Sequence, residues 1–187
     1  MMKVETTPID GLIVLQPNVL ADDRGFFMEA FKKSVFNDFG IKKEFVQDNH
    51  SRSSKHVIRG IHFQWNPPMG KLMRVTRGCA FLVAVDIRHG SPTLGEWVGR
   101  EVNEENKVQI YAPAGFARGF CSLSEITEIQ YKCTGEYNAA GEGGILWNDP
   151  EIGIEWPIDN PVLSDKDKNA QSLSDWLNTA ESQNFSV

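Results

Sequence analysis

The string Arg59-Gly60-Ile61-His62-Phe63-Gln64 carries a side chain suited to proton transfer at neutral pH. Histidine titrates near the working pH of most enzymes without special tuning, so His62 is a candidate general base. In a regular strand, His62 and Arg59 point to opposite faces. Both can face one pocket only if the strand bulges, and Gly60 is a residue type that permits a bulge. The alternative is a core histidine whose ring is hydrogen-bonded to backbone.

A second string, PAGFARGF at residues 113–120, resembles the second sequence motif of cupin barrels. Cupins usually carry a metal-binding histidine where this chain has Arg118, and a guanidinium cannot deprotonate to bind a metal. The first cupin motif normally supplies two histidines as H-x-H, and here it reads His62-Phe63-Gln64. Because two of the expected imidazoles are missing, we expect no bound metal, and a metal-dependent cupin oxygenase is disfavoured.

Two further side chains have both a structural and a chemical interpretation. Tyr131 lies on the strand face that we expect to line the barrel interior. Its phenol is either a core group with one hydrogen bond or a proton donor to a developing enolate. Asp167 stands three residues after Ser164, where it fits a helix capping box. The same carboxylate could instead orient the His62 ring, although no sequence rule pairs the two positions.

The elements that position these residues are predicted to be mainly strands. Several segments alternate apolar and polar residues with the period of a half-buried strand, and glycine- and proline-rich turns separate them. Many short strands with regular turns are typical of an antiparallel sandwich or barrel. The clearest segments are 57–64, 71–76, 79–87, 101–111 and 126–133.

Only two segments show the spacing of an amphipathic helix. Aromatic and aliphatic residues within 27–39 fall on one helical face, and Gly40 is suited to follow the last turn of that helix. A second helix is predicted to begin at Ser164 and to run toward Leu177. The expected fold is therefore mainly β with a few helices.

Composition places the chain among ordinary globular proteins: its 187 residues, 41% apolar and 24% charged, correspond to about one domain. A net charge of −6 argues against a nucleic-acid binder, and the absence of a run of five like charges argues against a membrane surface. We also expect no membrane span and no signal peptide. Three widely spaced cysteines predict buried thiols in a cytoplasmic protein: Cys79, Cys121 and Cys133.

Taken in order, nine short strings resemble the dTDP-4-dehydrorhamnose 3,5-epimerase family. Each string is weak alone, but their ordered combination is specific. The resemblance runs from about residue 8 to residue 178 and leaves a polar C-terminal tail, so we predict a single epimerase domain over residues 1–187. The strings are DRGFFME (23–29), QDNHS (47–51), VIRGIHFQ (57–64), KLMRV (71–75), SPT (91–93), PAGFARGF (113–120), YK (131–132), GILWNDP (144–150) and LSDKD (163–167).

The resemblance implies a cupin-type jelly-roll barrel with a few short peripheral helices. It also implies a homodimer in which N-terminal strands cross to the partner. The family reaction inverts C3 and C5 of a dTDP-4-keto-6-deoxyhexose, on the route to dTDP-L-rhamnose, without a cofactor. Both protons lie α to the C4 ketone, so removing either gives an enolate at O4. Inversion requires a base and an acid on opposite faces of the ring.

Carried over by position, the resemblance makes His62 the base, Asp167 its partner, Tyr131 the opposing acid and Lys71 the cation that stabilises the enolate oxygen. Without the resemblance, the lysines and Arg24 would be interpreted as surface charges. The implied nucleotide-sugar contacts include Phe26 and Tyr137 as candidate faces for thymine. The full set is Arg24, Phe26, Glu29, Gln47, Asn49, Arg59, Tyr137, Glu142 and Lys166.

Arg118 departs from the family pattern, in which most members carry histidine at this position. Its permanent charge can hold phosphate or sugar oxygens, but it cannot shuttle protons at pH 7. The departure leaves open a single-carbon (C3 or C5) epimerase, or a ketoisomerase acting on a related nucleotide sugar. A silent sugar-nucleotide binding protein is a further alternative, and the presence of His62 and Tyr131 argues against it.

Overall fold

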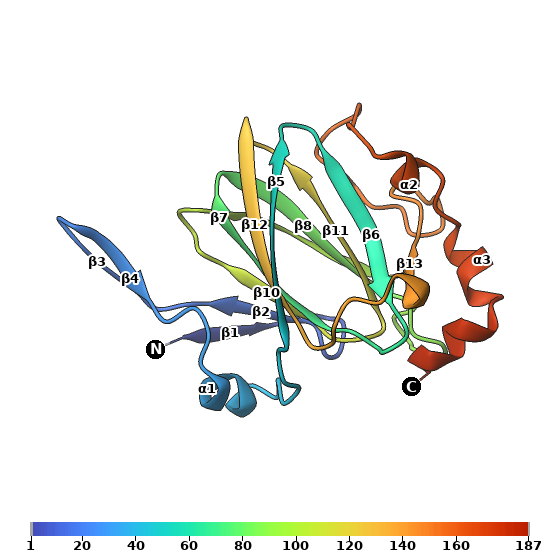
Figure 1. The fold of residues 1–187 in the computed structure, drawn as a ribbon, viewed down its shortest axis with the longest axis horizontal. Helices are drawn as coiled ribbons and strands as arrows, with labels where there is room; N and C mark the ends of the chain where they lie inside the picture. Colours follow the sequence, from blue (N-terminus) through green and yellow to red (C-terminus); the bar gives the residue numbers. More distant parts are fainter. Residues whose placement is uncertain (1, 187) are drawn as a thin grey trace.

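The computed structural model describes residues 2–186 as two antiparallel sheets packed face to face, with a hairpin projecting from one end (Figure 1). The six-stranded sheet has the order β1 (Lys3–Thr6), β2 (Ile13–Gln16), β10 (Gln109–Ala112), β7 (Lys71–Arg77), β12 (Ile126–Cys133) and β5 (Gln47–Ser54). The five-stranded sheet has the order β13 (Glu142–Gly144), β6 (Ile58–Gln64), β11 (Phe116–Ser122), β8 (Cys79–Asp86) and β9 (Trp97–Asn103). The mainly β fold is therefore confirmed.

Two apolar layers hold the five-stranded sheet in place, one on each face. Between the sheets, Leu82 packs with residues such as Ile110 and Ile129 of the opposite sheet. On the outer face, Phe63 packs against Trp176, with the ring centroids 4.4 Å apart. Because successive residues of a strand point to opposite faces, a sheet covered on both sides buries nearly every residue, as β11 does.

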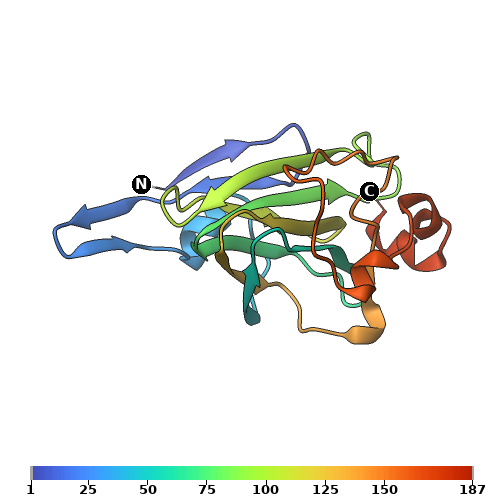
Figure 2. The ribbon, with the colours of Figure 1, turned by 90° about the horizontal axis from the view of Figure 1, so that it is seen from above.

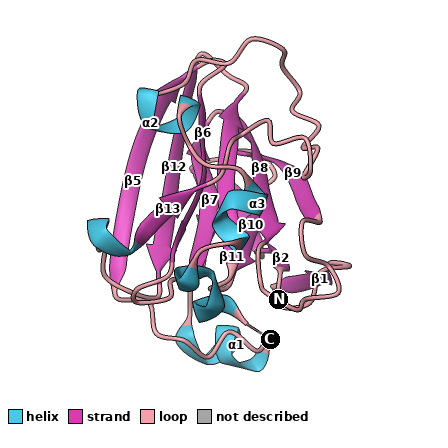
Figure 3. Cartoon of the chain, turned by 90° about the vertical axis from the view of Figure 1, so that its right-hand side faces the viewer, coloured by secondary structure: helices cyan, strands magenta, loops and turns pink. Residues whose placement is uncertain are grey.

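The outer layer comes from the C-terminal part of the chain. Helices α2 (Asp165–Lys168) and α3 (Leu173–Leu177) and the 3₁₀ helix Ala180–Phe185 lie over the five-stranded sheet (Figure 3). No helix within residues 2–186 is both long enough and apolar enough to cross a bilayer.

The single helix predicted from Ser164 toward Leu177 is wrong, because the segment forms α2 and α3 separately. Ser164 is the N-cap of α2, as expected. After α2 the chain becomes extended, and Gln171 makes a parallel bridge to Ile145 beside β13. Ser172 then starts a second capping box. The bridge and the new cap satisfy backbone groups that a continuous helix would have paired internally.

The helix predicted within 27–39 is shorter than expected. Helix α1 spans Lys33–Asp38, and the N–H of Gly40 binds the carbonyl of Asn37, so the predicted C-terminal glycine is confirmed. Phe27 instead belongs to β4 (Gly25–Met28), which pairs with β3 (Val19–Asp22). Pairing between the two strands overrides the helical spacing of the aromatic residues.

The strand predicted over 101–111 is also wrong, because it divides into β9 and β10, which lie in different sheets. Side-chain oxygens of two asparagines hold the turn between them. Asn106 donates its N–H to Asn103 Oδ1 at 2.7 Å, and Asn103 donates its N–H to Asn106 Oδ1 at 3.0 Å. Asparagine side chains stabilise turns in this way. The other predicted strands correspond to β6, β7, β8 and β12.

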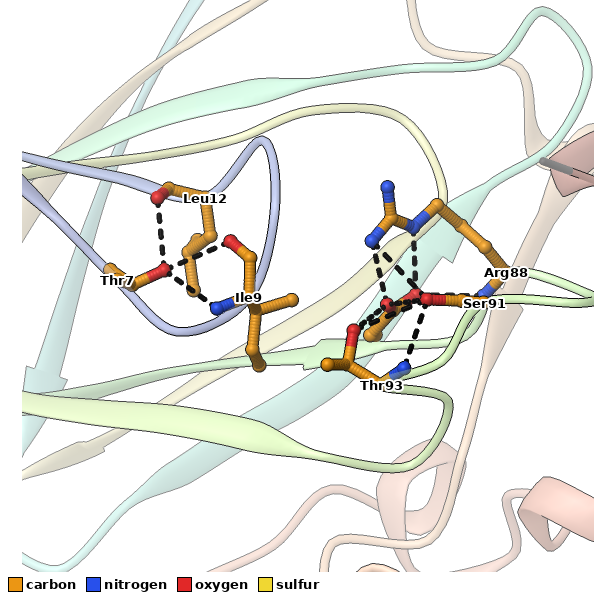
Figure 4. A network of polar contacts seen from close by, with 7 residues as sticks. Thr7, Ile9, Leu12, Arg88, Ser91 and Thr93 are labelled. Atoms are coloured by element: carbon orange, nitrogen blue, oxygen red, sulfur yellow. Dashed lines mark hydrogen bonds and ion pairs between the residues drawn. The ribbon is translucent and has the colours of Figure 1, made fainter.

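Polar anchors fix the loops at one end of the sandwich (Figure 4). Asp86 is fully buried and accepts hydrogen bonds from Arg88, Ser91 and Thr93 at 2.5 to 3.0 Å. Burial raises the pKa of Asp86, but the hydrogen bonds outweigh it and hold that pKa below its usual value. Thr7 similarly donates to carbonyls in the β1–β2 turn. The SPT string at 91–93 therefore has a structural role.

The β3–β4 hairpin extends away from both sheets (Figures 1 and 2). Its apolar side chains are solvent-exposed: Leu20 is 60% exposed, Phe26 55% and Phe27 68%. Exposed aromatic residues on a projecting hairpin are unusual for a surface without a partner.

Candidate active site

A bulge in β6 turns Arg59 and His62 toward the same cavity. Between them, Gly60 and Ile61 lie opposite the single residue Gly119 of β11, so β6 carries one extra residue. Gly60 has φ of +127°, and a Cβ added there would lie 2.6 Å from the Gly119 Cα. Only glycine fits this close approach. The bulge that Gly60 permits is therefore present, and it satisfies the condition for Arg59 and His62 to share one pocket.

The cavity measures about 310 Å³ and opens between the two sheets. All four predicted catalytic residues line it: His62, Lys71, Tyr131 and Asp167. His62 comes from the five-stranded sheet, whereas Lys71 and Tyr131 come from the six-stranded sheet, so a ring held between the sheets meets them on opposite faces. The predicted contacts Arg59, Arg118 and Lys166 line the same cavity.

His62 and Asp167 form a close pair, with Nε2 and Oδ1 2.6 Å apart. Ser164 Oγ accepts the backbone N–H of Asp167 at 3.1 Å. The α2 cap therefore uses the backbone of Asp167, while its carboxylate binds the imidazole. Burial raises the pKa of Asp167, but hydrogen bonds and charge from His62 outweigh it and hold that pKa below the usual value. The orienting role and the helix-cap position are thus compatible.

Lys71 and Tyr131 lie side by side across the cavity from His62. Lys71 Nζ is 5.0 Å from the centroid of the Tyr131 ring, a cation–π contact. Burial, followed by repulsion from Arg118, lowers the pKa of Lys71 to about 8. Burial raises the pKa of Tyr131 above its usual value, although a hydrogen bond with Asn49 opposes the shift. The phenol therefore remains protonated and available as an acid at neutral pH.

A chain of polar contacts joins five further predicted residues near the cavity. Lys166 Nζ donates to Glu142 Oε2 at 2.5 Å, and Tyr137 Oη donates to the same oxygen at 3.1 Å. The backbone N–H of Tyr137 binds Gln47 Oε1 at 2.9 Å, and Gln47 Nε2 donates to Asn49 Oδ1 at 3.0 Å. These contacts hold the segment after β12 against β5.

Three predicted contacts lie away from the cavity of their own chain. Arg24 is on the β3–β4 hairpin, where it forms an ion pair with Asp22, and its side chain is 89% exposed. Phe26 lies in the same hairpin, with Lys107 Nζ 3.7 Å from its ring centroid. Glu29 follows the hairpin. The fold of one chain does not bring these residues to the cavity.

Ser51 is a cavity residue that the sequence analysis did not single out. It lines the cavity from β5, and its Oγ is buried without a hydrogen-bond partner. An unpaired buried hydroxyl is costly unless a ligand completes its hydrogen bonding. The signal was present, since Ser51 follows Gln47 and Asn49 at the two-residue period of a strand.

The cysteines and the possible metal ligands were compared with the predictions for residues 2–186. No group of three or more His, Cys, Asp or Glu side chains there is placed to hold a metal ion. Cys79, Cys121 and Cys133 are free; Cys121 and Cys133 are buried as predicted, and Cys79 is only partly buried. Burial raises the pKa of Cys79 and of Cys121 to about 11, so neither is an activated thiolate.

Comparisons with known proteins agree with this geometry. A family model described as dTDP-4-dehydrorhamnose 3,5-epimerase matches residues 6–175. The chain is 52% identical to dTDP-4-dehydrorhamnose 3,5-epimerase of Shigella flexneri, covering 93% of this chain and 97% of the relative. It is 50% identical to the enzyme of that name from Salmonella typhimurium, covering 96% and 100%.

A solved structure shares the fold. The crystal structure of dTDP-6-deoxy-D-glucose-3,5-epimerase from Legionella pneumophila, in complex with dTDP-4-keto-L-rhamnose, matches with a TM-score of 0.93. The two sequences are 45% identical, and the match covers 97% of each chain. The cupin-type barrel expected from the sequence is confirmed by this likeness.

Proposed function

Because this chain belongs to the dTDP-4-dehydrorhamnose 3,5-epimerase family, we propose that it inverts C3 and C5 of dTDP-4-keto-6-deoxyglucose. The observation that carries the proposal is the grouping of base, acid and cation in one cavity: the His62–Asp167 pair on one side and Tyr131 with Lys71 on the other. Epimerisation of a 4-keto sugar needs all three groups. The base removes a proton α to the ketone, the cation stabilises the enolate oxygen, and the acid returns a proton to the other face.

His62 is the proposed base. Asp167 accepts the Nε2 proton of the ring, which leaves Nδ1 as the nitrogen that takes the substrate proton. The buried carboxylate then stabilises the imidazolium that forms. A base held in one orientation avoids the entropy cost of positioning it during each proton transfer.

Lys71 and Tyr131 are the proposed partners of the base. The Lys71 ammonium stabilises charge at O4 as the enolate develops, in a partly buried site where such an interaction is stronger than in water. Tyr131 supplies a proton from the opposite side of the ring. Return of a proton to the face opposite His62 inverts the carbon.

Nucleotide recognition is proposed to involve two chains of a homodimer. In support, the hairpin carrying Arg24 and Phe26 projects from the sheets (Figure 2), and its aromatic side chains are exposed. A hairpin that crossed to a partner would bury these side chains and bring Arg24 toward the diphosphate of a bound substrate. Arg59, Lys166 and Arg118 supply positive charge from within the chain's own cavity.

The proposed function is tested by incubating the enzyme with dTDP-4-keto-6-deoxyglucose in D₂O and following the ring protons by NMR. Each enolisation exchanges a carbon-bound proton for deuterium, so a 3,5-epimerase labels both C3 and C5. Label at one carbon only would identify a single-carbon epimerase. Binding of dTDP with label at neither carbon would instead identify a sugar-nucleotide binding protein.

A further inference from the structure

Arg118 is a buried cation without an acid partner. It lies opposite His62 in the β6–β11 pairing, and only 3% of the residue is exposed. Its Nε donates to the Phe116 carbonyl at 2.9 Å and its Nη2 to the Met69 carbonyl at 2.8 Å, whereas Nη1 has no hydrogen-bond partner. No carboxylate within residues 2–186 forms an ion pair with it.

A buried guanidinium that is neither paired nor fully hydrogen-bonded carries a large desolvation cost. Groups of this kind are concentrated where their charge serves a site. Arg118 and Lys71 line the same cavity, and repulsion from Arg118 is the largest cause, after burial, of the lowered pKa of Lys71. Through Met69, two residues before Lys71, the guanidinium also holds the backbone that enters β7.

We propose that Arg118 is a positioning residue that acts through Lys71: its unpaired charge, held at the start of β7 in the same cavity, favours transfer of a proton from the Lys71 ammonium to O4 as the enolate forms. This inference rests on the proposed function and deepens it. This role requires no hydrogen bond from Arg118 to the substrate, because Nε and Nη2 already donate to carbonyls.

Several groups around Lys71 act on its pKa, and Arg118 is one of those that lower it. Burial, Arg118 on β11 and Lys166 on α2 all lower the pKa of Lys71, which falls to about 8. Cys133 on β12 and Glu142 on β13 act in the opposite direction. The Tyr131 ring faces the ammonium, and His62 faces the cavity from β6. Burial lowers the pKa of Arg118 to about 10, so it remains a cation at neutral pH.

The proton transfers balance within the cavity. When His62 takes the proton from C3 or C5, the electron pair of that C–H bond becomes part of the enolate, and O4 takes a proton from Lys71. The intermediate is then a neutral enol beside a neutral amine and an imidazolium. On reprotonation, Tyr131 gives its proton to carbon and the O4 proton returns to Lys71. Solvent then returns the imidazolium proton to the phenolate.

The test measures the titration of Lys71 directly, by NMR of lysine side chains labelled with ¹³C at Cε in the free enzyme. The Lys71→Met protein identifies the signal. Arg118→Met should raise the titration midpoint of Lys71 by about one pH unit, because a like charge is removed. Arg118→Lys keeps a cation at pH 7, but burial lowers its own pKa as it does that of Lys71, so the Lys71 midpoint should rise less than in Arg118→Met. Arg118→His, which is neutral above about pH 7, should behave like Arg118→Met.

The kinetic arm separates this role from a binding role or a structural one. In Arg118→Met, kcat at pH 7 should fall about three- to tenfold, with recovery in Arg118→Lys. A weaker affinity for dTDP with an unmoved Lys71 midpoint would overturn the inference in favour of a direct grip on substrate. An equal kcat loss in both variants with an unmoved midpoint would overturn it in favour of packing.

Failure of the proposed function would be recognised separately. A wild-type protein that labels neither C3 nor C5 of the keto sugar in D₂O would refute the epimerase assignment. The Lys71 titration needs no substrate, so it would still show whether Arg118 controls the proton affinity of this lysine. A midpoint that rises in Arg118→Met without any change in kcat would overturn proton donation by Lys71.

Discussion

His62 Nε2 and Asp167 Oδ1 lie 2.6 Å apart, although 105 positions separate the two residues in the chain. One residue comes from the middle of β6 and the other from the four-residue helix α2. The helix cap at Ser164 fixes the backbone of Asp167, and the bulge at Gly60 fixes the direction of His62. The pair therefore depends on two local backbone features that the rest of the fold brings together.

Replacing the base tests the first assignment. His62→Asn should lower kcat by about 10²–10⁴-fold, the usual contribution of a general base. Its circular dichroism spectrum and melting temperature should stay close to wild type, because His62 is only partly buried. A folded His62→Asn protein with full activity would rule out His62 as the base.

Replacing the carboxylate should have a smaller effect. Asp167→Asn keeps the backbone N–H that Ser164 caps but loses the negative charge beside the imidazolium. We expect kcat to fall by about 10- to 100-fold, less than in His62→Asn. Ser164→Ala is the matched control for the cap and should lower the unfolding free energy by about 0.5–2 kcal/mol. A larger loss in Asp167→Asn than in His62→Asn would contradict the proposed order of roles.

The same carboxylate makes stability depend on pH. Its pKa in the folded protein is below the unfolded value, so the unfolded chain binds more protons as the pH falls below about 4. The stability that it contributes is present at neutral pH and is lost on acidification. Denaturant unfolding between pH 5 and pH 3 should therefore show a shallower loss in Asp167→Asn than in wild type. Parallel curves would show that Asp167 is not stabilised as a carboxylate.

Lys71 should also make stability rise with pH, but in an alkaline window, and its buried ammonium lowers stability at neutral pH. Its pKa of about 8 lies below the value of 10.5 for a free lysine, so the unfolded state binds more protons between these limits. The wild-type protein should gain stability as the pH rises through this window. Lys71→Met should be inactive yet more stable at pH 7 by about 1–3 kcal/mol, since one pKa unit corresponds to about 1.4 kcal/mol. A Lys71→Met protein that is less stable than wild type at pH 7 would contradict the burial of a charged amine.

Tyr131→Phe separates proton removal from inversion. The base on the opposite side is intact, so exchange of ring protons in D₂O should persist at a substantial rate. Delivery of a proton to the other face should fail, and product formation should fall by about 10²-fold or more. NMR of the same sample reports both quantities. Loss of exchange and inversion in equal proportion would argue that Tyr131 acts in the removal step.

Mixed dimers test the crossing of the β3–β4 hairpin. Chains carrying His62→Asn lack a base, and chains carrying Arg24→Ala with Phe26→Ala lack the hairpin contacts. If each hairpin serves the partner's cavity, a mixed dimer has one complete site, and activity should rise toward half that of wild type. The measurement is epimerase activity after the two inactive proteins are co-expressed and purified through different tags. No gain over the parent proteins would place the hairpin contacts within a single chain.

Local sequence pattern alone predicted the candidate base His62 and four of the strands. Alternation predicted β6, β7, β8 and β12, because the two-residue period of a strand is a local property. Gly60 signalled the bulge, because only glycine tolerates the approach of Gly119. The ordered strings pointed to the family, whose model matches residues 6–175.

The remaining features depend on strand pairing and packing between distant segments, which local sequence pattern does not encode. The 27–39 and 164–177 segments are helical by spacing, but strand pairing in one and the Gln171 bridge in the other shorten or divide the helices. The pairing of His62 with Asp167 and the burial of Arg118 depend on how the sheets and α2 pack around the cavity. These contacts join residues far apart in the chain. Their energies depend on how deeply the groups are buried and how close they lie to each other, and both are set only when the chain folds.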